Sequence, residues 1–201
     1  MVLYYQMEKI MKTLDEIHDF WKNPSDTNLP KKYITGERSL LLLDLFKQLE
    51  IEHESSILEL GCNVGRNLNA LYGSGYKNLS GIEININAKA VMKKEFPLVY
   101  KNAHIYWDSI ENITMPHADT IYTMAVLEHI HPDSEWIFEE MVSKTNKYII
   151  TIEDEHGTSW RHFVRNYKNV FENLGLTQIY EYNCEKVPGL NKNFFARIFT
   201  K

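Results

Sequence analysis

A glycine-bearing turn between two predicted strands is the part of this sequence most suited to hold a ligand. The turn contains Gly61 and Gly65, and because glycine lacks a Cβ atom, the backbone can turn tightly and approach a bound molecule there. Asn63 occupies the place where a second glycine is usual, and asparagine is one of the few residues that tolerate a positive φ. The helix that follows would direct unpaired N–H groups and the positive end of its dipole at a carboxylate. A glycine turn alone is weak support, since an ordinary helix cap has the same pattern.

Two acids after the next strands fit a nucleoside. Glu83 stands at the end of the second strand, 22 positions after Gly61, where a carboxylate can accept hydrogen bonds from both hydroxyls of a ribose. This spacing is shared with dinucleotide-binding folds, so it indicates a ribose and not a particular cofactor. Asp108 follows the third strand and could accept a hydrogen bond from an adenine amino group. The alternative for Glu83 is a surface acid, and for Asp108 a turn cap.

Four side chains are candidates for a general base. Glu128, His129 and His131 follow the fourth strand, and His156 follows the fifth, so all four are expected on the ligand side of the sheet. Histidine suits proton removal near neutral pH, and His156 is the preferred candidate ahead of His129. The alternative interpretation is that the histidines cap the helix predicted at Pro132 and that Glu128 faces solvent. The sequence predicts no metal site.

Alternating strands and helices must position these residues. We expect helices at 3–21, 37–49, 67–71, 87–96, 132–143 and 159–174, and strands at 56–60, 79–84, 104–107, 120–125, 148–152, 176–183 and 194–199. The alternation predicts an α/β fold with a mostly parallel sheet and helices on both faces. Because no long helix separates the last two strands, they should form a hairpin, which makes one strand antiparallel.

The bulk composition limits the class of protein. A length of 201 residues suits one domain, and a net charge of −5 argues against nonspecific nucleic-acid binding. Cys62 and Cys184 are expected to be free thiols in a reducing compartment. The chain lacks a run of about 18 apolar residues, and its first residues lack the features of a signal peptide. We expect a cytoplasmic protein with no nucleic-acid or membrane partner.

The motifs together resemble the class I S-adenosylmethionine-dependent methyltransferase family. ELGCNVG, GIEIN, YWDSI and ADTIYTMAVLEHI match the family's first four motifs in order and spacing over roughly residues 33–154. The resemblance implies a Rossmann-like seven-stranded sheet with the last strand antiparallel. It also implies a cofactor site in which the methionine part is lined by Glu59, Gly61, Cys62, Asn63 and Gly65, the ribose and adenine by Glu83, Ile84, Asp108 and Ser109, and the sulfonium end by Ala125 and Leu127.

The segment before the sheet is expected to cover the site. Residues 1–50 would form a helical cap of the same domain as the methyltransferase region, residues 51–201. In this family such an extension often closes over the cofactor as a lid, so Tyr33 and Arg38 could reach the methionine carboxylate. A purely structural capping helix is the alternative. The predicted helix at 159–174 should face the core, with Arg161, His162 and Arg165 in solvent or on an anionic acceptor.

The resemblance also implies the kind of acceptor. The fourth motif is MAVLEH, and it lacks the Asn/Asp-Pro-Pro-aromatic run of methyltransferases that act on base amines and some protein amides. We therefore expect methyl transfer to an oxygen or nitrogen of a small molecule, such as a sugar or secondary metabolite, with S-adenosylhomocysteine as product, by a monomer or homodimer. One rival is a catalytically silent subunit that only binds cofactor or a partner. The other is an NAD-dependent oxidoreductase, which the bulky Asn63 and Arg66 disfavour.

Overall fold

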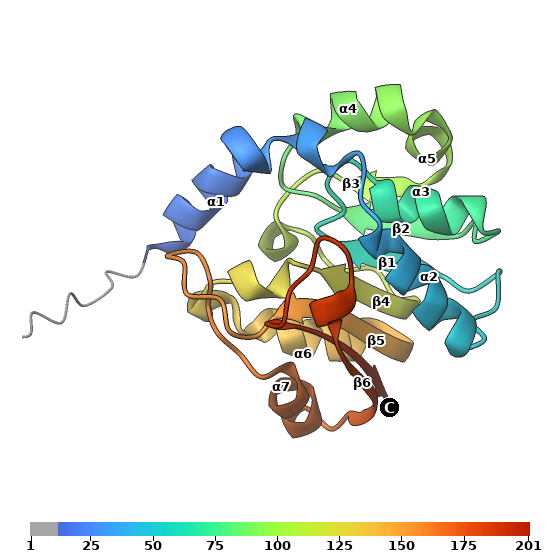
Figure 1. Cartoon of the computed structure of the whole chain (residues 1–201), viewed down its shortest axis with the longest axis vertical. Helices are drawn as coiled ribbons and strands as arrows, with labels where there is room; N and C mark the ends of the chain where they lie inside the picture. The colour runs from blue at the N-terminus through green and yellow to red at the C-terminus, as the bar shows by residue number, and fades with distance from the viewer. Residues whose placement is uncertain (1–11) are drawn as a thin grey trace, which may run out of the picture.

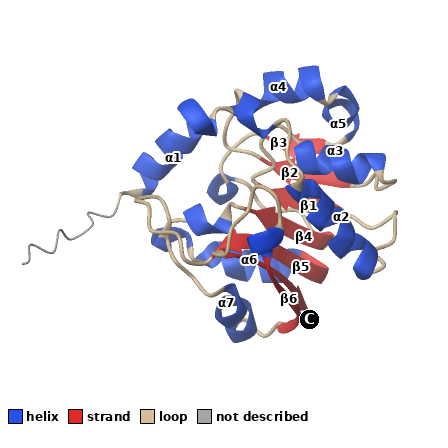
Figure 2. Ribbon diagram, viewed as in Figure 1, coloured by secondary structure: helices blue, strands red, loops and turns tan. Residues whose placement is uncertain are grey.

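A seven-stranded sheet with helices on both faces forms the centre of the computed structural model, which describes residues 12–201 (Figures 1 and 2). Its strands run in the order β3-β2-β1-β4-β5-β7-β6. They are β1 (Ile57–Leu60), β2 (Leu79–Ile82), β3 (His104–Tyr106), β4 (Ala118–Met124), β5 (Thr145–Asp154), β6 (Thr177–Asn183) and β7 (Phe194–Thr200). The predicted fold class is confirmed.

The strand order reverses at β1, which pairs in parallel with β2 on one side and with β4 on the other. At the end of β1, Leu60 is opposite both Ile82 and Thr123, so the three strands finish side by side. Open sheets of this kind bind ligands in the crevice beyond this point. The final hairpin is present as predicted, and β7 runs antiparallel to both β5 and β6.

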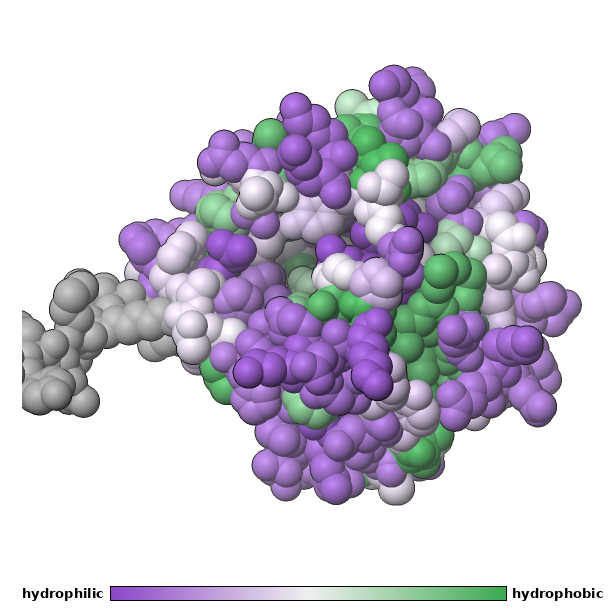
Figure 3. Space-filling model, in the orientation of Figure 1, coloured by the Kyte–Doolittle hydropathy of each residue, from purple (hydrophilic) through white to green (hydrophobic). Residues whose placement is uncertain are grey.

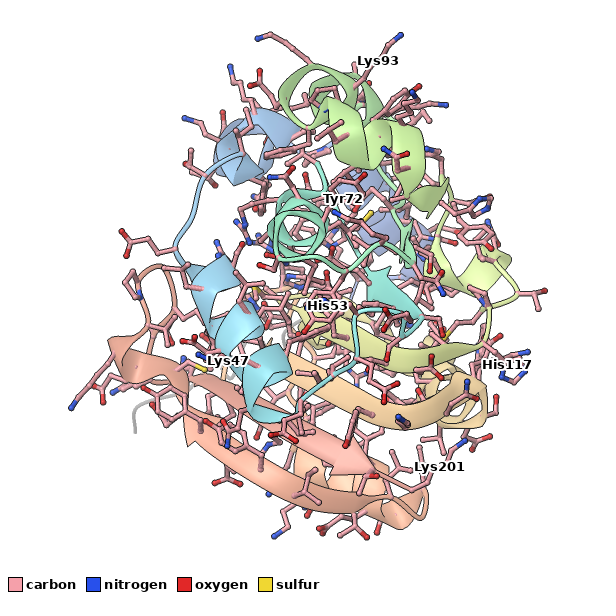
Figure 4. All side chains as sticks on the ribbon, turned by 90° about the vertical axis from the view of Figure 1, so that its right-hand side faces the viewer. Lys47, His53, Tyr72, Lys93, His117 and Lys201 are labelled. Carbon is pink, nitrogen blue, oxygen red and sulfur yellow. The ribbon has the colours of Figure 1, made fainter. Side chains whose placement is uncertain are left out.

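Side chains alternate between the two faces of each strand, and each face has its own helices. Ile57, Tyr122 and Ile150 belong to the core beneath α2 (Arg38–Gln48), α3 (Arg66–Gly73), α4 (Ala88–Glu95) and α5 (Pro97–Asn102). Figure 4 shows this side, where Lys47, Tyr72 and Lys93 mark α2, α3 and α4.

The opposite face of the sheet carries the second core. Leu58, Ile121 and Ile149 pack with residues of α6 (Trp136–Lys144) and α7 (Tyr167–Asn173). Short 3₁₀ turns complete the loops: η3 (Ile110–Asn112), η4 (Leu127–His129), η5 (Pro132–Ser134) and η6 (Cys184–Lys186). Both cysteines are free and buried. Across residues 12–201 we find no helix with the length and apolar character needed to span a membrane.

The first helix of the described residues is α1 (Leu14–Lys22), which lies apart from the other helices in Figure 1. Thr13 and Glu16 form a capping box, in which each side chain bonds to the other residue's backbone N–H, and this fixes the start of the helix. The part of the predicted helix at residues 3–11 lies outside the described residues. The polar stretch after α1 forms two 3₁₀ turns, η1 (Asp26–Asn28) and η2 (Pro30–Tyr33), before α2 begins.

The helix predicted at 159–174 is mostly absent, and only α7 (Tyr167–Asn173) forms. Asn166 caps this shorter helix, because its side chain accepts a hydrogen bond from the backbone of Asn169. The preceding residues bond to another part of the chain: the N–H of Phe163 donates to the carbonyl of Glu128 at 2.8 Å. These nonlocal hydrogen bonds replace the helical ones, so residues 159–166 run as an irregular segment beside η4.

Candidate active site

A cavity of about 270 Å³ lies beyond the carboxyl ends of β1, β2 and β4. Figure 3 shows the molecule hollowed on this face, between α1 and the ends of the strands. The cavity brings together most of the side chains that the sequence indicates. They are Tyr33, Arg38, Glu59, Gly61, Cys62, Asn63, Glu83, Ile84, Ser109, Ala125, Glu128 and His129. The predicted residues that do not line it are Gly65, Asp108, Leu127, His131 and His156.

Three residues in the turn after β1 have a left-handed backbone. The φ angles are +68° at Gly61, +47° at Asn63 and +78° at Gly65, so asparagine does replace glycine in this conformation. A Cβ atom on Gly61 would lie 2.5 Å from Cγ2 of Val126, so this glycine lets the turn pass against the loop after β4. Gly65 faces the helices instead, since its Cβ would lie 2.9 Å from Cε of Met92.

Glu83 presents a fixed carboxylate to the cavity. It is 5% exposed, and its two oxygens each accept a backbone hydrogen bond of 2.7 Å, from Asn63 and from Asn85. Burial opposes the charge more strongly than these two bonds favour it, so the pKa of Glu83 is raised to about 7. Each oxygen retains a lone pair for a further donor, which suits a pair of ribose hydroxyls.

Glu59 lies deeper, at 2% exposure, and has an unused acceptor. Its Oε1 accepts a hydrogen bond of 2.7 Å from Asn67, whereas Oε2 is buried without a partner. Burial raises the pKa of this carboxyl to about 7. Because a buried polar atom without a partner is costly, Oε2 fits a donor supplied by a ligand, such as the ammonium group of a methionine.

Two arginines line the same end of the cavity with different roles. Arg66 is occupied by structural bonds, since its guanidinium donates to Ser39, to the carbonyl of Thr35 and to Asn67. Arg38 forms no hydrogen bond or ion pair within residues 12–201, so its charge is available for a carboxylate. Tyr33 beside it is kept neutral, because burial raises its pKa.

Asp108 and Ser109 occupy different environments although they are adjacent. Asp108 accepts hydrogen bonds from the N–H of Ser109 at 2.7 Å and from Asn112 at 3.0 Å, and these bonds lower its pKa. Asp108 therefore caps this turn, and its contact with adenine stays a prediction. Ser109 lines the cavity, and its buried hydroxyl has no partner among the described residues. Leu127 is fully buried in the core that contains α6.

The base candidates separate into two groups. Glu128 and His129 line the cavity, whereas the exposed His156 lies outside it with its ring against Phe195. His131 points elsewhere too: its Nδ1 accepts a bond from the N–H of Asp133 and caps η5, as the alternative interpretation has it.

Several cavity residues are absent from the sequence-based set of site residues. Leu14, Ile17, His18 and Trp21 come from α1, and Arg161 and His162 from the segment before α7. Helical spacing of apolar residues predicts one helix at 159–174, with Arg161 and His162 in solvent or on an anionic acceptor. In the folded chain the ring of His162 lies 4.9 Å from that of His129.

A Rossmann-like sheet with a buried acid after β2 and a left-handed turn after β1 defines a protein that binds an adenosyl cofactor. A sequence profile described as a methyltransferase domain matches residues 32–147. The chain therefore belongs to the class I S-adenosylmethionine-dependent methyltransferase family. The predicted family, activity and cofactor are confirmed, and the dinucleotide alternative falls away.

Solved structures share the fold at low sequence identity. A S-adenosylmethionine-dependent methyltransferase from Leishmania major has a TM-score of 0.70 and 15% identity, over 93% of this chain and 82% of that one. Magnesium protoporphyrin IX methyltransferase from Synechocystis PCC 6803, with bound S-adenosylmethionine, has a TM-score of 0.66 and 12% identity over 92% and 94%. Coclaurine N-methyltransferase, bound to N-methylheliamine and S-adenosylhomocysteine, has a TM-score of 0.57 and 14% identity, over 73% of this chain and 50% of that one. No curated protein matches this chain.

Proposed function

We propose that this enzyme transfers a methyl group from S-adenosylmethionine to an oxygen or nitrogen of a small molecule. The observation that carries the proposal is a single cavity in which the acids suited to the cofactor and the cluster of Glu128, His129 and His162 face the same space. The cofactor supplies a methyl group on a positively charged sulfur, which is already activated for transfer. The protein must therefore mainly align the two reactants and accept a proton.

The cofactor half of the cavity has a donor or acceptor for each polar part of the molecule. Glu83 would accept the ribose hydroxyls, Oε2 of Glu59 would accept the ammonium group, and Arg38 would hold the carboxylate. Ile84 and the hydroxyl of Ser109 lie on the wall of the same cavity and suit the adenine. The left-handed backbone at Gly61 and Asn63 forms the tight turn, and the missing Cβ of Gly61 lets it pass close to Val126.

The acceptor half contains groups that bind and deprotonate a small polar molecule. A lone pair of the acceptor atom forms the new bond to carbon, the carbon–sulfur bond breaks with its electrons passing to sulfur, and a proton leaves the acceptor. Glu128 and His129 both line the cavity and would receive that proton. Trp21 and Arg161 provide an aromatic and a cationic wall.

A small acceptor is favoured because α1 lies over the cavity. Leu14, Ile17 and Trp21 of this helix line the space, so a folded macromolecule would have to displace them to reach the cofactor. Two of the similar structures are enzymes named for small-molecule substrates, magnesium protoporphyrin IX and coclaurine. These names support a small-molecule acceptor for this chain as well.

Binding and turnover test the two parts of this proposal separately. Calorimetry should detect binding of S-adenosylmethionine and of S-adenosylhomocysteine, and no binding of NAD. Release of S-adenosylhomocysteine should then occur with members of a panel of small alcohols, sugars and amines, and not with oligonucleotides or peptides. Turnover only with a macromolecule would overturn the acceptor class, and absence of cofactor binding would overturn the site.

A further inference from the structure

Three potential metal ligands converge on the acceptor side of the cavity. The side chains of Glu128, His129 and His162 each direct one ligand atom to a common point, and these atoms all lie within 4.8 Å of one another. Oε1 of Glu128 is 3.4 Å from Nε2 of His129 and 3.4 Å from Nε2 of His162. Tetrahedral coordination with bonds of about 2.0–2.2 Å separates neighbouring ligand atoms by roughly 3.3–3.5 Å. The two observed distances therefore suit a metal ion between these groups.

The charge of Glu128 lacks a permanent counter-ion. Its side chain is 5% exposed, and within the described residues it forms no ion pair with a lysine or arginine, only with the two histidines. Glu153 lies beside it as a second buried carboxyl group, and its Oε2 is bonded to the backbone N–H groups of Val126 and Glu128. A buried carboxylate is normally paired or bound to metal, so Glu128 suits a cation.

The histidines are oriented as metal ligands are. Nδ1 of His129 lies 2.9 Å from the carbonyl oxygen of Arg161, and because a carbonyl only accepts, Nδ1 carries the proton and Nε2 has a free lone pair. His162 is also held through Nδ1, which is hydrogen-bonded to the hydroxyl of Ser159, and this contact fixes the orientation of the ring. Oε2 of Glu128 accepts the N–H of Asp154 at 2.6 Å, which turns Oε1 toward the imidazoles. Such outer bonds fix the orientation of ligands in metal sites.

We propose that Glu128, His129 and His162 bind one divalent transition-metal ion. Two imidazoles and one carboxylate form a set that zinc and iron(II) sites use with coordination positions left open. Here the open positions would face the cavity, where an acceptor oxygen could bind and become easier to deprotonate. This role rests on the proposed function and favours oxygen acceptors, such as hydroxyls, over amines. The sequence alone predicts no metal site, because the irregular segment at 159–166 brings His162 to Glu128.

Cobalt(II) is a suitable probe because its visible absorption reports its ligands. The full chain, treated with a chelator and then freed of it, should bind about one equivalent of cobalt(II) and develop a visible band. The variants His162→Gln and Glu128→Gln should each lose affinity by at least about tenfold. His117→Gln is the matched control and should leave binding unchanged, since this exposed histidine, labelled in Figure 4, stands just before β4 at the end of the strand opposite to the cavity. Circular dichroism and thermal unfolding would establish that each variant is folded.

Each outcome decides the inference separately from the methyltransferase activity. Absence of a cobalt band in the wild-type protein, or an equal band in a folded Glu128→Gln/His162→Gln double variant, would overturn the metal site. Calorimetry with S-adenosylhomocysteine in the presence of chelator tests the cofactor site alone. Cofactor binding without metal binding would leave the proposed function standing and reduce the cluster to a proton acceptor.

Discussion

The backbone N–H of Asn63 donates a hydrogen bond of 2.7 Å to Oε2 of Glu83, so the turn after β1 is held by the acid that follows β2. The two motifs therefore form one unit. The same carboxylate that would bind a ribose also fixes the loop facing the amino-acid end of the cofactor. Substitutions at Glu83 should affect both regions of the site.

Glu83→Ala should weaken the binding of S-adenosylhomocysteine by about 1–3 kcal/mol, because the ribose hydroxyls lose a charged acceptor. Titration calorimetry at neutral pH measures this directly. Glu54→Ala serves as the control, since Glu54 is an exposed acid in the loop before β1. This variant should bind the cofactor with the same affinity as the wild-type protein. Equal affinities for the two variants would remove Glu83 from the ribose site.

Stability of the unliganded protein should fall as pH rises between about 4.5 and 7. Burial raises the pKa values of Glu59 and Glu83 to about 7, so the folded state binds protons in this range that the unfolded state releases. The loss is on the order of 3 kcal/mol per carboxyl at most, and it levels off above about pH 7. Urea unfolding across this range measures it, and a Glu59→Gln/Glu83→Gln variant should give a flatter profile.

The cofactor should have the opposite pH dependence. Ribose hydroxyls and an ammonium group favour the ionised forms of Glu83 and Glu59, so affinity for S-adenosylhomocysteine should increase from about pH 6 to about pH 8. Calorimetry at the two pH values tests this. An affinity independent of pH would mean that neither carboxyl changes its protonation on binding.

Asn67→Ala should destabilise the protein by about 1–3 kcal/mol. Nδ2 of Asn67 donates to Glu59 at 2.7 Å and its Oδ1 accepts the hydroxyl of Ser39 at 2.7 Å, so the substitution leaves buried polar groups without partners. Asn69→Ala on the same helix is the matched control, because Asn69 forms no side-chain hydrogen bond within the described residues. Denaturant unfolding of both variants would show whether the loss is specific.

Glu128→Gln should lower turnover by about 10²-fold or more at saturating cofactor, whereas His156→Ala should retain it. Glu128 lines the cavity, and His156 is exposed outside it. Release of S-adenosylhomocysteine with a fixed acceptor gives both rates. A strong loss of turnover in His156→Ala, together with normal turnover in Glu128→Gln, would favour His156 as the general base, as the sequence analysis does.

His18→Ala should loosen α1 from the body of the protein. Nε2 of His18 lies 3.1 Å from Oε1 of Glu111, which joins the helix to η3 across the cavity. We expect cleavage in the loop after α1 by a protease to become a few-fold faster, in line with a hydrogen bond worth roughly 1 kcal/mol. Cofactor should slow the cleavage of both the wild-type protein and the variant. An unchanged cleavage rate in the variant would mean that the contact between His18 and Glu111 does not hold α1 in place.

Much of the fold and of the cofactor site could be predicted because it depends on local sequence. Alternating apolar strands and amphipathic helices predict the layers of the sheet, and the spacing of Gly61, Asn63 and Glu83 predicts a turn and an acid at adjacent strand ends. The conformation of Asn63 also follows from its own chemistry, since it depends on the φ values that one residue can adopt.

The acceptor half depended on contacts between distant parts of the chain. Phe163 donates its N–H to the carbonyl of Glu128, and the helix predicted from residue 159 begins only at Tyr167, which places His162 beside His129 and leaves His156 outside. Apolar periodicity contains no information about such bonds. The sequence by itself determined the adenosyl-binding fold through local backbone preferences. Only the tertiary structure decided which acids, histidines and arginines share the cavity, because nonlocal hydrogen bonds and burial set their positions.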